Sequence, residues 1–96
     1  MGRMNVDPMV TFSDGTRLLI STQSSREGNF TCELFVAKPD LADHLDLRAV
    51  SHPVEGPTCL DAQEGAYRSA TRLYPDTADH IKRPPYLIWH GPTHYS

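Results

Sequence analysis

The chain has 96 residues, of which 39% are apolar and 22% charged, and its formal net charge at pH 7 is −3. This length predicts a single domain over residues 1–96, with an ordered core at about 9–89 and polar termini at 1–7 and 90–96. The acidic excess disfavours a protein that binds nucleic acid or anionic membranes through charge alone. No apolar run reaches the roughly 20 residues of a membrane span, so no membrane association is expected.

The first residues and the cysteines predict a cytoplasmic protein. Residues 1–6 contain no apolar stretch that could serve as a secretory signal. Two cysteines, Cys32 and Cys59, are too few for a disulfide framework in a chain of this size. We expect both to be reduced thiols.

The first half of the chain predicts β-strands, because apolar and polar residues alternate with a period of two. A short β-prone run at 10–12 leads into a turn at 13–16, where Gly15 accepts a positive φ without a Cβ clash. A strand follows at about 16–23, and the polar loop at 24–28 is long enough to close a second hairpin.

The third predicted strand is the clearest, since its alternation extends over residues 30–37. Its first face is apolar and carries Phe30, Cys32, Leu34 and Val36. The outer face of this strand and the one before it is mixed and carries Arg17, Leu19, Ser21, Thr31, Glu33 and Phe35. Pro39 ends the strand because proline cannot donate to the ladder. A weaker fourth strand is expected at 45–50, before the break at His52 and Pro53.

The second half changes period and predicts one long helix, from Cys59 to just before Pro75. Thr58 and Asp61 resemble a capping box at its start. A narrow stripe of small residues, which Leu73 continues, lets the helix pack close to a sheet, and it consists of Ala62, Ala66 and Ala70. The opposite, charged side carries Glu64, Arg68 and Arg72.

Together these elements predict an α+β fold of two layers, in which one main helix packs on one face of an antiparallel sheet of three to four strands. Leu19 and Phe35, on the outer sheet face, need cover from elsewhere. We favour an intramolecular role for the last apolar run, 86–89, which either folds back onto this face or pairs as an edge strand. The reason is that so small a domain needs its large apolar side chains for the core. The alternative is an anchor in a protein interface, in which aromatic residues are common. The candidate binding residues are Leu19, Phe35, Tyr86 and Trp89.

A second set of candidates is basic and consists of Arg68, Arg72, Lys82 and Arg83. A three-stranded antiparallel sheet followed by a helix with spaced alanines resembles the layout of AP2-type and integrase amino-terminal DNA-binding modules, over roughly residues 10–73. Those modules read the major groove with basic and aromatic side chains on the sheet, and the resemblance therefore implies a nucleic-acid-binding alternative. The mixed outer face and the net charge weigh against it. The overall look is also similar to that of small proteins common in Gram-negative bacterial genomes.

No motif in the chain predicts catalysis or a cofactor. It contains no G-x-S-x-G elbow, no glycine-rich phosphate loop and no H-E-x-x-H pattern. Cys59 at the start of a helix is a candidate reactive thiol, but the sequence shows no partner for it, and we interpret it as a small helix-start residue. Five histidines invite a metal-site interpretation, which we set aside because Gly91 and Pro92 prevent His90 and His94 from sharing a helix face.

The sequence therefore predicts a small binding or protein-interaction module that is not an enzyme and needs no metal or cofactor. Its partner is another protein or a second copy of the chain. The alternative is a nucleic-acid-binding domain that uses the basic residues of the C-terminal half.

Overall fold

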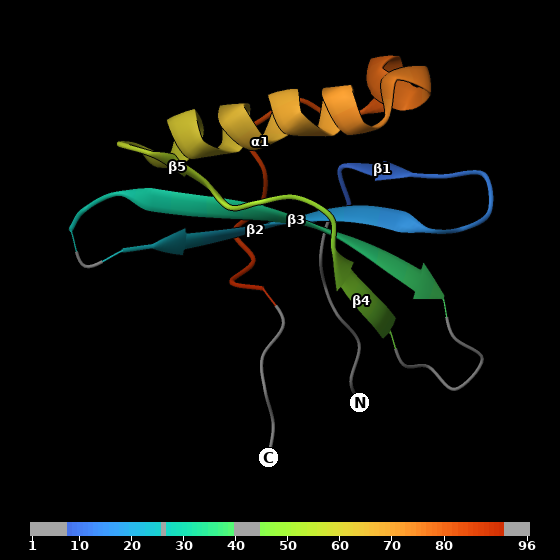
Figure 1. Ribbon diagram of the computed structural model, residues 1–96, viewed down its shortest axis with the longest axis horizontal. Coiled ribbons are helices and arrows are strands. Elements are labelled where there is room, and N and C mark those ends of the chain that lie inside the picture. The colour runs from blue at the N-terminus through green and yellow to red at the C-terminus, as the bar shows by residue number, and fades with distance from the viewer. Residues whose placement is uncertain (1–7, 26, 40–44, 92–96) are drawn as a thin grey trace.

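A twisted antiparallel sheet and one long helix form two layers (Figure 1), so the α+β class predicted from the hydrophobic pattern is confirmed. The computed structural model describes residues 8–25, 27–39 and 45–91. The predicted polar termini lie outside these ranges, except for His90 and Gly91.

The sheet has five strands, one more than the largest number predicted. They are β1 (Val10–Thr11), β2 (Arg17–Ser24), β3 (Phe30–Pro39), β4 (Leu45–Ala49) and β5 (Val54–Gly56). The strand order is β1-β2-β3-β4, with β5 also paired to β3, and every pairing is antiparallel. The first four strands lie where the period-two pattern places them.

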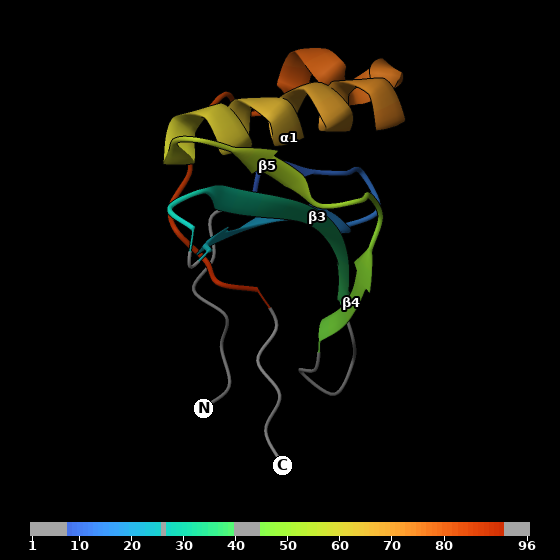
Figure 2. The same cartoon turned by 60° about the vertical axis from the view of Figure 1, so that its left-hand side comes forward.

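The unexpected strand β5 follows β4 along the same edge of β3 (Figure 2). Ala49 lies opposite Phe35, and Val54 lies opposite Cys32. The chain therefore advances five residues from β4 to β5 while β3 advances only three. The two extra residues form a bulge that contains Pro53. Proline was expected to end the sheet here, whereas it only interrupts the pairing, because β3 is long enough to accept a second short strand.

The helix α1 (Cys59–Leu73) begins as predicted, because the Thr58 hydroxyl accepts a hydrogen bond of 3.0 Å from the backbone N–H of Asp61. The three alanines of the predicted stripe are fully buried. Leu73 does not continue this stripe and is 46% exposed. The rings of Phe12 and Tyr74, 5.1 Å apart, pack against the core at this end of the molecule.

Two glycines allow β5 to lie directly against α1. A Cβ on Gly65 would stand 2.5 Å from Cγ1 of Val54, and a Cβ on Gly56 would stand 2.6 Å from the backbone nitrogen of Ala62. Side chains larger than hydrogen therefore do not fit at either position without a shift of the helix or the strand.

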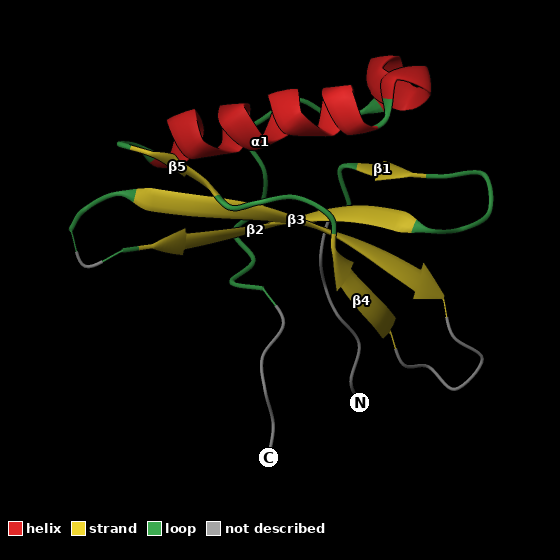
Figure 3. Cartoon of the chain, in the orientation of Figure 1, coloured by secondary structure: helices red, strands yellow, loops and turns green. Residues whose placement is uncertain are grey.

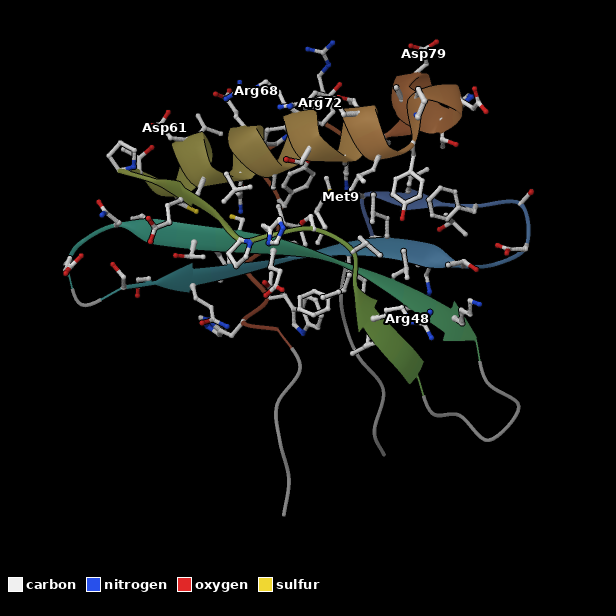
Figure 4. The ribbon with its side chains drawn as sticks, in the orientation of Figure 1. Met9, Arg48, Asp61, Arg68, Arg72 and Asp79 are labelled. Carbon is white, nitrogen blue, oxygen red and sulfur yellow. The ribbon has the colours of Figure 1, made fainter. Side chains whose placement is uncertain are left out.

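The main core lies between α1 and the sheet, and it is built from the side that the alternation predicts. Its central sheet residues are Leu18, Ile20, Cys32 and Leu34, each at most 1% exposed. Met9 joins them from the segment before β1 and lies between the two layers (Figure 4). The opposite side of the sheet, which carries Leu19 and Phe35, is called the underside below.

After α1 comes the 3₁₀-helix η1 (Pro75–His80), and residues 82–91 then run without helix or strand (Figure 3). This C-terminal segment descends from the helix layer past the edge of β2 to the underside (Figures 1 and 2). The predicted edge strand at 86–89 is therefore absent, because the chain crosses the edge of the sheet at this point.

Candidate functional site

The C-terminal segment is attached to the helix layer by one buried amide, that of Gln63. This side chain is 1% exposed. Its Nε2 donates to Oγ1 of Thr22 at 3.1 Å and to the carbonyl of Tyr86 at 3.3 Å, while its Oε1 accepts from the backbone N–H of Tyr86 at 3.0 Å. Gln63 thus supplies hydrogen-bond partners to a stretch of backbone that has no strand beside it.

Tyr86 holds the helix-side end of this segment. It is 7% exposed, belongs to the main core, and its hydroxyl donates to the carbonyl of Lys82. Burial is the main factor that raises the pKa of the Tyr86 phenol well above its ordinary value. The hydroxyl therefore stays protonated and keeps its role as a donor.

Trp89 holds the underside end. Its carbonyl accepts a hydrogen bond of 2.7 Å from the backbone N–H of Thr22 in β2. Its ring meets the Phe35 ring edge to face, with centroids 5.6 Å apart and an interplanar angle of 74°. One residue later, the Gln23 side chain donates to the carbonyl of His90. The segment therefore folds back onto the sheet face, as the first interpretation of this run predicts, although not as a strand.

Two large apolar side chains are left in solvent between these anchors. Leu87 is 66% exposed and Ile88 is 55% exposed, the highest values among the large apolar residues that the structure describes. Both lie where the segment crosses the edge of β2. Phe35 and Trp89, whose rings are in contact with each other, are half-buried. We call these four residues the apolar patch: Phe35, Leu87, Ile88 and Trp89.

The structure places the four predicted binding residues in two environments. Leu19, opposite Phe35 in the β2–β3 register, is 2% exposed, and Tyr86 is also buried, in the core. Phe35 and Trp89 keep part of their rings in solvent. Leu87 and Ile88 were not singled out as binding residues, since their exposure depends on where the chain crosses the sheet edge.

Two of the four basic candidates converge with an aromatic ring. Arg68 of α1 and Arg83 of the C-terminal segment line a hollow of about 330 Å³ together with Glu64, Tyr67 and Pro84. The Arg83 guanidinium lies over the Tyr67 ring, 5.7 Å from its centroid. Arg72 points outward from α1 near Arg68 (Figure 4) but does not line the hollow, and neither does Lys82.

A second hollow, of about 500 Å³, lies where the β1–β2 turn meets the end of α1. Its apolar wall includes Phe12, Val36 and Leu73. Its polar rim includes Asp14, whose pKa is lowered mainly by the hydrogen bond that its carboxylate accepts from the backbone N–H of Thr16 at 2.9 Å. The sequence contains no signal for this hollow, because turn, strand and helix end meet only in the tertiary structure.

The thiols and histidines are dispersed in the part of the chain that the structure describes. No three His, Cys, Asp or Glu residues gather there closely enough to hold a metal ion, and His44 and His94 lie outside the described residues. Cys32 is buried beside the Thr22 hydroxyl, and burial raises the pKa of its thiol. Cys59 is half-buried at the start of α1.

Comparison with known proteins finds no match, whether to a family model, a curated protein or a solved structure. The strands β4 and β5 add to the three-strand layout that resembles the AP2 and integrase modules. None of the helices among the described residues is long and apolar enough to cross a membrane.

Proposed function

We propose that this chain is a small, non-catalytic protein-interaction module that binds a partner protein through the apolar patch. The exposure of Leu87 and Ile88 between two anchored residues carries the proposal. Tyr86 and Leu19, both buried, are not part of this surface.

The anchoring also favours binding energetically. Full burial of a Leu or Ile side chain stabilises by about 1.5–3 kcal/mol, and more than half of that surface is still exposed at Leu87 and Ile88. The backbone on both sides is already held by Gln63 and by Thr22, so a partner has little chain entropy left to remove.

The test compares the double variant Leu87→Ser/Ile88→Ser with the matched control Leu60→Ser/Leu73→Ser. Both pairs are large, exposed apolar side chains, but the control pair lies on α1, away from the patch. Affinity capture from lysate with each protein as bait is read by mass spectrometry. We expect a protein that wild type and control retain and that the patch variant loses at least tenfold.

The captured protein is then titrated into wild type while the emission of Trp89 is recorded. Trp89 is the only tryptophan in the chain and belongs to the patch, so binding there must change its spectrum. Equal capture by all three baits, or saturable binding without a change in emission, would contradict the proposal.

The alternative function is nucleic-acid binding, and the convergence of Arg68, Arg83 and the Tyr67 ring supports it. Arginine and aromatic side chains together provide phosphate contacts and a stacking surface. Glu64, which lines the same hollow, opposes it. In this case a labelled duplex or single strand binds at low salt, the affinity falls steeply as salt rises, and Arg68→Ala/Arg83→Ala abolishes it. An unchanged signal in titrations at about 50 mM salt excludes this function.

A further inference from the structure

The sheet has an open edge at β4. This strand pairs with β3 on one side, and its other side receives no hydrogen bond from any residue that the structure describes. Figures 1 and 2 show β4 at the end of the sheet that bends away from α1. Natural edge strands are commonly protected by proline, bulges or charged side chains, above all lysine; Leu45–Ala49 contains no proline or lysine, and its two charged residues, Asp46 and Arg48, have opposite sign.

The hydrogen bonding next to β4 establishes which of its backbone groups are free. The N–H of Val50 donates to the carbonyl of Leu34 in β3 at 3.0 Å. Because backbone groups alternate in direction along a strand, the even-numbered residues Asp46 and Arg48 also direct theirs toward β3. Among the residues that the structure describes, the N–H and C=O groups of Leu45, Leu47 and Ala49 are therefore the ones left without a partner.

These free groups are arranged symmetrically about Leu47. When a second copy of the strand approaches antiparallel, with Leu47 opposite the partner's Leu47, each Leu45 lies opposite an Ala49. All three outward residues then form hydrogen-bonded pairs, with about six backbone hydrogen bonds in total. This register uses every free group of the strand.

Formal charge selects the same register. With Leu47 at the centre, position 46 lies opposite the partner's position 48, so a formally negative position is opposite a formally positive one twice. When the two-fold axis passes through residue 46 or residue 48 instead of Leu47, the outward backbone groups can still pair. The first of these registers places Asp46 opposite the partner's Asp46, and the second places Arg48 opposite the partner's Arg48. Like charges directly opposite each other are destabilising, so these neighbouring registers are disfavoured.

We infer that the chain forms a two-fold symmetric dimer in which β4 pairs with β4 of a second copy, centred on Leu47. The inference rests on backbone groups of β4 and not on the proposed partner protein, although Ala49 of β4 lies opposite Phe35 of the apolar patch.

Sedimentation equilibrium on the full chain, from about 10 µM to about 1 mM, tests the dimer through a charge swap. Arg48→Asp places acidic residues opposite each other twice, and we expect it to weaken the dimer at least tenfold. Asp46→Arg/Arg48→Asp, combined with Lys38→Glu because Lys38 of β3 lies opposite position 46, exchanges the charges and restores the wild-type dimerisation constant. Arg48 is exposed, so its replacement leaves the fold intact, and circular dichroism of each variant verifies this.

A backbone variant supplies a second test. Ala49 is exposed and its N–H points outward, so Ala49→Pro removes a donor from the free edge without removing a bond to β3. We expect a monomer for Ala49→Pro and a dimer for the matched control Ala49→Ser. A wild-type monomer over the whole range, a swap variant that stays monomeric, or loss of the dimer in Leu87→Ser/Ile88→Ser overturns the inference. The last outcome would place the contact between copies at the apolar patch.

Discussion

Single buried polar groups determine where the C-terminal segment lies. Gln63 occupies a position on α1 among the buried alanines, where an apolar residue is expected, and its amide binds both the N–H and the carbonyl of Tyr86. A buried amide that is fully hydrogen-bonded costs little, whereas each unpaired partner costs about 1–3 kcal/mol. The segment is therefore held by few interactions, all of them specific.

The stability of the protein should depend on the protonation of Tyr86. An unfolded tyrosine has a pKa of about 10, and burial raises the pKa of Tyr86 in the folded state above this value. Above about pH 10 the unfolded chain therefore binds fewer protons than the folded one, and the free energy of unfolding falls as the pH rises.

The measurement compares wild type with Tyr86→Phe by urea unfolding between about pH 7 and pH 11. At neutral pH the variant loses the hydrogen bond to the Lys82 carbonyl and about 1 kcal/mol of stability. Above about pH 10 the difference should shrink, because only wild type has this phenol to titrate. A constant difference across the range would show that the group titrates alike in both states.

At the scale of elements, the packing of β5 against α1 depends on two glycines, Gly56 and Gly65, which have no side chain. The contact exists because Gly65 leaves room for Val54, although glycine costs a helix about 1 kcal/mol relative to alanine. A sequence-based view treats Gly65 as a weak point of the helix, whereas the tertiary structure makes it the point of closest approach. Pro53 is a similar case: the sequence predicts that it ends the sheet, but it lies in a bulge after which the pairing with β3 resumes at Val54.

Gly65→Ala should destabilise the protein by about 1–3 kcal/mol despite its better helix propensity, because the new Cβ would stand 2.5 Å from Cγ1 of Val54. Val54→Ala removes the obstructing methyl group, so the double variant should regain most of the loss that Gly65→Ala causes. Thermal unfolding of wild type, both single variants and the double variant forms a mutant cycle. Additive effects in this cycle would show that the two positions do not meet.

For the molecule as a whole, the two layers leave three surfaces with different chemistry. The outward side of α1 is charged, the edge of β4 presents free backbone groups, and the underside carries the apolar patch. The β4 edge adjoins the patch, since Ala49 lies opposite Phe35, but the proposed dimer uses backbone groups of β4 and the proposed partner site uses side chains of β3 and the C-terminal segment.

The sequence by itself determined the class of fold, four of the five strands, the helix with its Thr58 cap, and the sheet face that forms the main core. All of these follow from local periodicity and local hydrogen bonding, which act over a few residues. The strand β5, the Gln63 contacts, the crossing of 82–91 at the edge of β2 and the exposure of Leu87 and Ile88 were decided only by the tertiary structure. Each depends on the meeting of segments distant in the chain, where steric fit and the pairing of buried polar groups outweigh local preference.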